Sequence, residues 1–234
     1  MPVKKLPESE VEHELKIQLS QRDLEKVFVA LKKKAVGKKI EHKYLPRAYY
    51  DTHDLLLYRH SISVRMQYKP GKNGKMGSYE QTVKFDLPPG EEVAKGSFLR
   101  KECKDPTRDY VPSLAKITDR EGRATAKPFR NKKVKHIFTA AIERRSFELK
   151  AGRGKKSGVV EVAFDVGEII LDTNGRRYPF SEIEIEMVKG NAEAIALVQK
   201  KIKKLARSAK LQPLSKAQHG TRLYKRIARG RKSR

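Results

Sequence analysis

The segment Val11-Glu12-His13-Glu14-Leu15-Lys16-Ile17-Gln18-Leu19 decides the fold of this chain. Side chains of a β-strand point alternately to its two faces, and this segment alternates throughout. One face carries Glu12, Glu14, Lys16 and Gln18, and the other carries Val11, Leu15, Ile17 and Leu19. Two carboxylates and an ammonium on one face fit a solvated sheet surface, but they also fit one wall of a metal-phosphate site.

The chain has 234 residues, of which 38% are hydrophobic, and only one is a cysteine. This length allows a proper core, so we expect one folded domain over residues 1–226 and a basic, disordered tail over 227–234. A single cysteine excludes an internal disulfide framework and indicates a reducing compartment. No apolar run is long enough to span a membrane, and the first ten residues lack a signal-peptide core. We therefore expect a cytoplasmic protein that does not bind membranes.

The chain is strongly basic, with 54 Lys and Arg residues against 28 Asp and Glu residues and a net charge of +26. Such a charge attracts polyanions, including nucleic acid, nucleotides and polyphosphate. A generally basic surface explains the charge equally well. The positions of the few acidic residues are therefore more informative than the net charge.

Hydrophobic periodicity predicts a mainly antiparallel sheet with helices added to it. Alternating segments predict strands near 11–19, 47–50, 62–68, 79–87, 97–104, 137–149, 159–171 and 182–187. Turn residues predict hairpins at 70–74 and 150–154. Helical spacing predicts amphipathic helices over 20–34, after 191, and over 215–227. Between the strands we expect a short helical insertion over 106–118 and a basic loop over 121–135.

Strands with one polar and one apolar face can be arranged in two ways. The polar face can contact water, as in an ordinary sandwich. Alternatively, the sheet closes with its polar face inward, and the amphipathic helices cover the apolar outer face.

Acidic residues gather on the polar faces of three predicted strands. These residues are Glu12 and Glu14, Glu161 and Asp165, and Glu182, Glu184 and Glu186. Carboxylates placed side by side destabilise one another unless a cation lies among them. Hard oxygen ligands of this kind suit Mg²⁺, Mn²⁺ or Ca²⁺. For any single strand, an exposed face whose acids pair with lysines is the better explanation, but three such strands favour a metal site.

Basic residues lie on the same polar faces, at Lys16, Arg65, Lys84, Arg100 and Arg144. Cations inside a barrel are costly unless a polyanion binds there. Acids that hold a metal beside bases that hold phosphate oxygens are the expected chemistry for a metal-bound triphosphate.

Several segments, in order, resemble the motifs of the CYTH superfamily, the triphosphate tunnel metalloenzymes. Glu12-His13-Glu14-Leu15-Lys16 is similar to its ExExK motif, and Tyr49-Tyr50-Asp51-Thr52 to its YfDT segment. Further matches are Ile62-Ser63-Val64-Arg65, Thr82-Val83-Lys84, Arg100-Lys101-Glu102, Glu161-Val162-Ala163-Phe164-Asp165, Glu182-Ile183-Glu184-Ile185-Glu186 and Ser215-Lys216-Ala217-Gln218. Together these matches cover nearly the whole chain.

The resemblance implies an α+β fold, a closed eight-stranded antiparallel β-barrel that forms a tunnel, with helices packed outside. It implies Mg²⁺ or Mn²⁺ as the cofactor, held by Glu12, Glu14, Asp165, Glu182, Glu184 and Glu186. The implied phosphate-binding residues are Lys16, Arg65, Lys84, Arg100, Arg144 and Lys216. Lys16, Glu161 and Lys216 are the implied catalytic residues, with Glu161 and Glu102 orienting the bases or the attacking water.

The chain departs from the family pattern at Gln67, where many members have a second arginine, and at Lys104, where a second glutamate is expected. These positions affect the choice of substrate and leave the fold prediction intact. We expect a metal-dependent hydrolase that converts inorganic tripolyphosphate to pyrophosphate and phosphate. The alternatives are a class IV-type adenylyl cyclase, a thiamine, nucleoside or RNA 5′-triphosphatase, and a non-catalytic polyphosphate- or RNA-binding module. The sequence does not fix the oligomeric state, and a dimer is one option.

Overall fold

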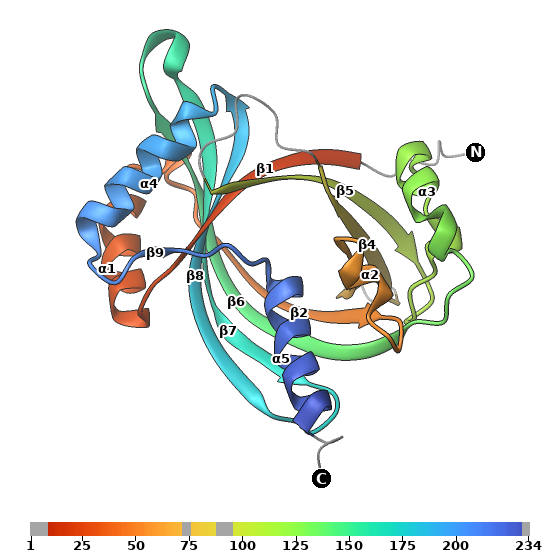
Figure 1. The fold of residues 1–234 in the computed structure, drawn as a ribbon. Coiled ribbons are helices and arrows are strands. Elements are labelled where there is room, and N and C mark those ends of the chain that lie inside the picture. The colour runs from red at the N-terminus through yellow and green to blue at the C-terminus, as the bar shows by residue number, and fades with distance from the viewer. Residues whose placement is uncertain (1–8, 72–75, 88–95, 231–234) are drawn as a thin grey trace.

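A computed structural model of the chain describes residues 9–71, 76–87 and 96–230. Its central feature is a barrel of eight antiparallel strands in the order β5-β4-β3-β2-β6-β7-β8-β1, closed by pairing of β1 with β5 (Figure 1). A ninth strand, β9, pairs with β1 outside this ring. The predicted α+β fold with a closed eight-stranded barrel is therefore confirmed.

The strands of the sheet are long and continuous. They are β1 (Ser9–Gln18), β2 (Glu41–Asp51), β3 (Ile62–Lys69), β4 (Ser78–Asp86), β5 (Ser97–Thr107), β6 (Lys135–Ala151), β7 (Gly158–Leu171), β8 (Arg177–Gly190) and β9 (Lys210–Leu211). The helices are α1 (Gln21–Lys32), α2 (Leu56–Arg59), α3 (Arg120–Ala126), α4 (Glu193–Leu205) and α5 (Lys216–Gly230), with short 3-10 turns between them. None of the described helices is long and apolar enough to cross a membrane.

Strand β1 joins the two ends of the sheet. Its register places Glu12 opposite Arg100 of β5 and Lys16 opposite Glu184 of β8. Acidic and basic side chains therefore face one another across both seams of β1. Opposite charges at such cross-strand positions stabilise a pairing, and this register fixes which face of β1 points inward.

The apolar residues lie outside the barrel, beneath the helices. One cluster, which includes Phe28, Phe147 and Phe164, packs under α1 and α4. A second lies under α5, and a third surrounds α2 and α3. Because the helices bury this outer face, the polar faces of the strands are left to line the interior. Of the two arrangements considered from the sequence, the inward-polar one is correct.

Helix α1 forms where the sequence predicts it. The Ser20 hydroxyl accepts a hydrogen bond from the backbone N–H of Asp23, which caps the first turn. Leu24, Val27, Phe28 and Leu31 are buried, and their helical spacing gives the helix one apolar face.

Helix α5 begins with a reciprocal cap. The backbone N–H of Gln218 donates to the Ser215 hydroxyl at 3.1 Å, and the Ser215 N–H donates to the Gln218 side chain at 2.9 Å. This capping box fixes the first turn of the helix and therefore the position of Lys216. One turn further on, Gly220 lies against the ring of Phe138, where an added Cβ would come within 2.3 Å of a ring carbon. Only glycine allows this close approach of α5 to β6.

The predictions for two connecting segments, 106–118 and 121–135, are wrong. Pro106 and Thr107 belong to the end of β5, and the region predicted as a helical insertion contains only the 3-10 turn Leu114–Lys116. The predicted basic loop contains α3, capped by the Asp119 carboxylate, which accepts from the N–H of Gly122 at 2.7 Å. Burial of Ala126 and Phe129 against the barrel provides the apolar contacts that hold this basic segment in place.

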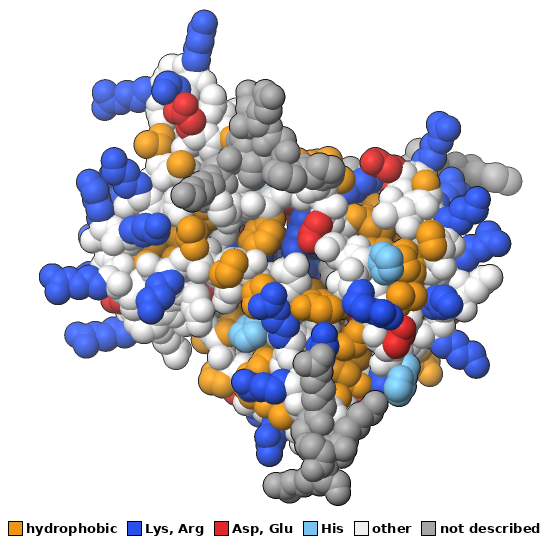
Figure 2. Space-filling view, in the orientation of Figure 1, with side chains coloured by type: hydrophobic (Ala, Val, Ile, Leu, Met, Phe, Trp, Pro, Cys, Tyr) orange, Lys and Arg blue, Asp and Glu red, His pale blue; other side chains and the backbone are white. Residues whose placement is uncertain are grey.

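Smaller differences concern the ends of elements. Strand β2 extends well before the predicted 47–50 segment. Helix α5 continues to Gly230, so residues 227–230 are helical, whereas residues 231–234 of the predicted tail lie outside the described part of the chain. The 70–74 hairpin prediction also falls largely outside the described residues, which omit 72–75. Lys and Arg side chains project from most of the face seen in Figure 2, in keeping with the high net charge.

Candidate active site

The barrel encloses a cavity of about 500 Å³ lined mainly by charged side chains. Most of the predicted site residues lie on its wall. These are Glu12, Glu14, Lys16, Arg65, Lys84, Arg100, Arg144, Glu161, Glu184, Glu186 and Lys216. Asp165 and Glu182 complete the predicted set, and they adjoin the cavity beside Glu184.

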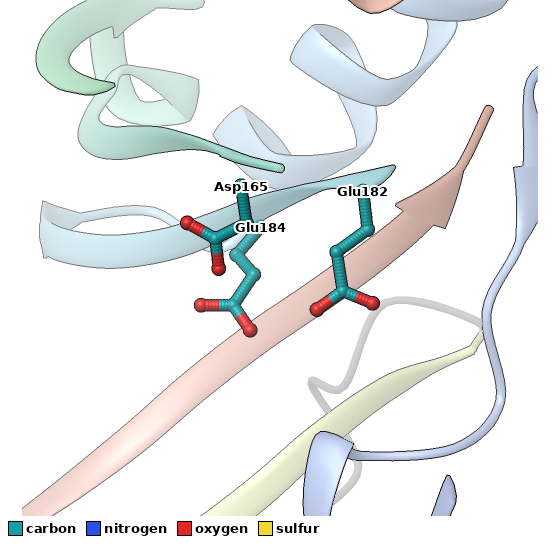
Figure 3. Close-up of side chains that lie close together, drawn as sticks. All are labelled: Asp165, Glu182 and Glu184. Carbon is teal, nitrogen blue, oxygen red and sulfur yellow. The ribbon is translucent and has the colours of Figure 1, made fainter. Parts of the chain in front are cut away.

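Three carboxylates converge on one side of this cavity. Asp165 of β7 and Glu182 and Glu184 of β8 are buried, and each offers an oxygen within 4.8 Å of the others (Figure 3). They belong to neighbouring strands, with Asp165 directly opposite Glu182 in the register. We call these three acids, together with Lys16, Arg144 and Lys216, the acid wall.

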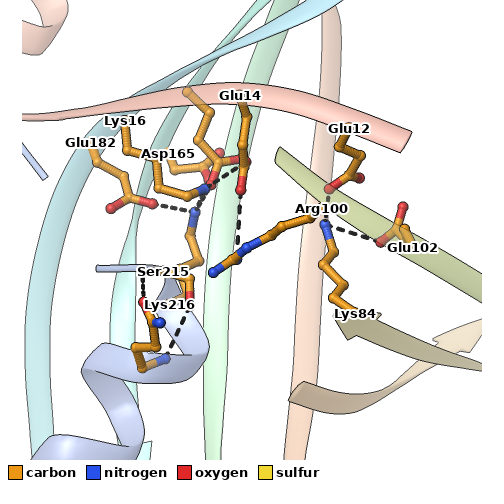
Figure 4. Close-up of polar contacts among 12 residues, drawn as sticks. Glu12, Glu14, Lys16, Lys84, Arg100, Glu102, Asp165, Glu182, Ser215 and Lys216 are labelled. Carbon is orange, nitrogen blue, oxygen red and sulfur yellow. Dashed lines mark hydrogen bonds and ion pairs between the residues drawn. The ribbon is translucent and has the colours of Figure 1, made fainter. Parts of the chain in front are cut away.

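Two lysines and an arginine balance the acid wall. The Lys216 ammonium lies 2.6 Å from Oδ2 of Asp165 and 2.7 Å from Oε1 of Glu184, and it also contacts Glu182. The Lys16 ammonium bridges Glu184 and Glu14, the latter at 2.9 Å (Figure 4). Lys216 comes from α5 and Lys16 from β1, so the acid wall joins the C-terminal helix to the first strand.

Arg144 holds the remaining oxygens of this wall. Its Nε and Nη2 donate to the two oxygens of Asp165 at 2.7 and 2.6 Å, and Nη2 also contacts Glu184. This bidentate geometry is the strongest way for arginine to bind a carboxylate. The next residue, Arg145, pairs with Glu25 on the outside of the barrel, so Arg144 is the one of the two that lines the cavity.

The cations set the ionisation of these acids. Burial opposes the charge of Glu184, but Lys16, Lys216 and Arg144 outweigh burial and hold its pKa well below the ordinary value. The pKa of Asp165 is lowered in the same way, since burial is outweighed by Arg144 and Lys216. At Glu182 burial is the larger effect, and the pKa of that carboxyl is raised.

The opposite side of the barrel is predominantly basic. Arg47 of β2, Arg65 of β3, and Thr82 and Lys84 of β4 follow one another around it, and we call these residues the basic wall. Glu102 of β5 receives Arg65 Nη2 at 3.0 Å and Lys84 at 3.1 Å on the same oxygen, while Lys104 contacts its other oxygen at 2.5 Å. Lys84 also contacts Glu12.

Glu14 and Arg100 lie between the two walls. Arg100 Nη1 is 3.7 Å from Oε1 of Glu14 (Figure 4). Nε of Arg100 is 2.8 Å from Oδ1 of Asp86. Burial disfavours the charge of Glu14, but Lys16, Lys84 and Arg100 together lower its pKa below the ordinary value.

The six predicted metal ligands therefore do not form one cluster. Asp165, Glu182 and Glu184 come together, whereas Glu12 belongs with Lys84 near the basic wall. Glu186 lies opposite Glu161 in the β7–β8 register, further along the cavity. Burial and the negative charges of Glu12, Glu14 and Glu184 raise the pKa of Glu186 to about 8.

The acid wall fits a hard divalent cation. Its three converging carboxylates are the oxygen donors that Mg²⁺ and Mn²⁺ prefer. In this structure the same oxygens converge on the Lys216 ammonium, which shows that the group is arranged to hold positive charge.

Arg47 was given no role from the sequence. It lies on the cavity wall, and its Nε donates to Oε1 of Gln67 at 3.3 Å. The signal that could have found it is the alternation of Leu45, Arg47 and Tyr49, which is visible only if the strand is extended before residue 47. Because the predicted strand began at Arg47, only Arg47 and Tyr49 of this face lay within it, which is too few residues to show an alternating pattern.

Comparison with protein-family models gives one match, to the CYTH domain, over residues 10–221. The chain belongs to the CYTH family. The match extends from the first strand into α5, and it therefore includes both walls of the cavity.

Two solved structures share the CYTH fold with this chain. A candidate adenylate cyclase from Bacillus halodurans is 17% identical, with a TM-score of 0.55 over 90% of this chain and 97% of that one. A candidate adenylyl cyclase from Hippeastrum, with a dominant triphosphatase activity, is 15% identical, with a TM-score of 0.54 over 88% of this chain and 92% of that one. No curated protein sequence matches the chain. At these identities the likeness shows the fold alone.

Proposed function

We propose that this protein is a metal-dependent triphosphatase that hydrolyses inorganic tripolyphosphate to pyrophosphate and phosphate. The observation that carries the proposal is the arrangement of the cavity, in which converging carboxylates and several buried cations face one another inside a closed barrel. A polyanion with bound metal would balance both sets of charges. The triphosphatase activity of the Hippeastrum protein of the same fold supports this choice.

In this proposal Asp165, Glu182 and Glu184 hold Mg²⁺ or Mn²⁺, with Glu14 adjoining them through Lys16. When bound, the metal would polarise phosphate oxygens and help orient the attacking water. Binding of the metal requires Lys216 to give up its place among the three carboxylates. The freed ammonium then lies beside the cavity, where it would bind a phosphate oxygen.

The other residues bind and orient the substrate. Lys16, Arg65, Lys84, Arg100 and Arg144 line the cavity, and each can donate hydrogen bonds to phosphate oxygens. Their positive charges, held in place by Glu14, Glu102 and Asp165, would stabilise charge that develops on the transferring phosphoryl group. Glu161 lines the same cavity, and we assign it to orienting the water that attacks in line with the leaving group.

A hydrolysis panel tests the proposal. Purified protein is incubated with Mg²⁺ or Mn²⁺ and with tripolyphosphate, thiamine triphosphate, ATP or a 5′-triphosphate RNA. We expect phosphate release from tripolyphosphate that depends on the metal and is lost in Glu14→Gln. No phosphate release from any of the four substrates would reject the proposal.

The same panel decides the main alternative. Adenylyl cyclase is favoured by the fold shared with the Bacillus halodurans protein. A cyclase would convert ATP to cyclic AMP and pyrophosphate without releasing phosphate, and chromatography separates these products. Tight, salt-sensitive RNA binding without metal dependence and without turnover would instead identify a binding module.

A further inference from the structure

Arg47 is a cation without a counterion in the part of the chain that the structure describes. Its Nε donates to the neutral side chain of Gln67 at 3.3 Å, and no described carboxylate lies within ion-pair distance of its guanidinium. Burial and the like charges of Arg65 and Arg144 lower the pKa of Arg47 to about 10, so the group stays protonated at neutral pH.

Two further polar atoms of the basic wall have no hydrogen-bond partner among the described residues. They are Nε of Arg65 and the hydroxyl of Thr82, and both atoms are buried. Thr82 is fully buried, at 0% exposed, and it lies opposite Arg65 in the β3–β4 register. Arg65 in turn lies opposite Tyr49, two residues along β2 from Arg47. Residues two apart share one face of a strand at a spacing of about 7 Å, so these groups form one continuous surface.

Such a surface is costly without a ligand. Buried polar atoms are almost always hydrogen-bonded, and a half-buried cation that has no counterion among the described residues and lies near two other cations is destabilising. All three residues line the cavity, so a ligand in the cavity can reach them. The unsatisfied groups are a guanidinium, an N–H and a hydroxyl, all of which can donate to an anion with several oxygens.

We propose that Arg47, Arg65 Nε and Thr82 form an anion subsite that binds a phosphoryl group of the substrate. The subsite is on β2, β3 and β4, across the barrel from the carboxylates of β7 and β8. It would therefore hold the end of the triphosphate remote from the metal. The proposal rests on the triphosphate function proposed above, and it adds the residues that select a substrate with a free anionic end.

Binding and melting experiments with the full chain test the subsite. Tripolyphosphate is titrated calorimetrically into wild-type, Arg47→Gln and Thr82→Val proteins in EDTA, where no metal can bridge the ligand. Thermal unfolding of the same proteins is measured without ligand. Arg177→Gln is the control, because it removes an exposed arginine that pairs with Glu168 outside the cavity.

We expect Arg47→Gln to weaken tripolyphosphate binding by about 10- to 100-fold and Thr82→Val by about 3- to 10-fold. We also expect Arg47→Gln to raise the ligand-free melting temperature by about 2–4 °C, because an unpaired charge is removed. Arg177→Gln should change neither quantity. Arg47→Lys keeps the charge but loses the planar fork, so its affinity should lie between those of the wild type and Arg47→Gln, with no gain in melting temperature.

The outcomes separate this proposal from the hydrolase proposal. Wild-type affinity in Arg47→Gln, or no tripolyphosphate binding by the wild type, would overturn the subsite. A lower melting temperature in Arg47→Gln would also overturn it, because Arg47 would then be a structural residue. Arg47-dependent binding by a protein that hydrolyses nothing would support the subsite and reject only the hydrolase.

Discussion

The acid wall and the basic wall carry similar groups but differ in how their charges are balanced. In the acid wall Lys16, Arg144 and Lys216 each contact at least two carboxylates. In the basic wall Arg65 and Lys84 share one oxygen of Glu102, and among the described residues Arg47 contacts only the neutral amide of Gln67. The charges of the acid wall therefore nearly balance one another, whereas the basic wall carries more positive charge than its carboxylate neighbours neutralise.

This difference indicates what each wall is suited to bind. An internally paired set of charges stays folded without ligand and can exchange one cation for another, as a metal would replace Lys216 in the proposed function. A set with surplus charge is satisfied only by an added anion. Variants that change one wall at a time test this difference.

The largest effect is expected from Glu184→Gln in the acid wall. Glu184 contacts Lys16, Arg144 and Lys216, so its loss removes a proposed metal ligand and leaves three buried cations undercompensated. We expect triphosphate hydrolysis to fall by about 100- to 1,000-fold, measured as phosphate release. Glu168→Gln is the matched control, since Glu168 pairs with Arg177 outside the cavity. Activity within threefold of the wild type would contradict the role of the acid wall.

Metal binding should stabilise the protein through the same wall. At a Mn²⁺ concentration of 100 times the dissociation constant, the stabilisation is about 2.7 kcal/mol, which corresponds to a rise of roughly 5–10 °C in melting temperature. EDTA should reverse this rise, and Glu182→Gln should reduce it. An equal rise in Glu182→Gln would place the metal elsewhere.

Gly220→Ala tests how the acid wall is completed, because that wall depends on a helix whereas the basic wall is built on strands. Glycine to alanine within a helix usually gains up to about 1 kcal/mol. Here the new methyl group would meet the Phe138 ring at 2.3 Å, so we expect a net loss of about 1–3 kcal/mol and reduced activity from a displaced Lys216. Denaturant unfolding measures the loss, with Lys225→Ala as the control. A more stable Gly220→Ala protein would show that α5 docks more loosely.

The smallest effect is expected at Glu102, the carboxylate that pairs with Arg65 and Lys84 of the basic wall. Burial disfavours its charge, but Lys84, Arg65 and Lys104 outweigh burial and hold its pKa below the ordinary value. A carboxylate with a lowered pKa stabilises the fold above its unfolded pKa, and this contribution is lost as the pH falls. The stability difference between wild type and Glu102→Gln should therefore shrink, by about 0.7 kcal/mol, from pH 7 to pH 4. A stability difference that grows on acidification would contradict the assignment.

The regular alternation predicted antiparallel strands with one polar face and left two arrangements open, and the resemblance to the CYTH motifs implied the closed barrel. Once Glu12, Glu14 and Lys16 share a face, every alternating strand contributes its own polar row to the same interior. What alternation does not contain is the register between strands far apart in sequence. The separation of Glu12 from the cluster of Asp165, Glu182 and Glu184 follows from that register, which the sequence pattern does not contain.

The local errors have local causes. The 121–135 region was interpreted as a loop because of its charge, although Asp119 supplies a cap and Phe129 an anchor in the apolar cluster around α2 and α3. Arg47 was missed because a basic residue at the edge of a short strand is indistinguishable from a surface arginine. Only the paired neighbours on β3 and β6 show that it points inward.

Strand β1 has a consequence for how the protein is made. It is synthesised before the other strands of the barrel, yet its partners are β5, more than 80 residues later, and β8, about 170 residues later. Until β8 is complete, the nascent sheet has open edges that can pair with other chains. Closure of the barrel is therefore a late event in synthesis, and a change that delays β1 should reduce the yield of protein more than the stability of the finished fold.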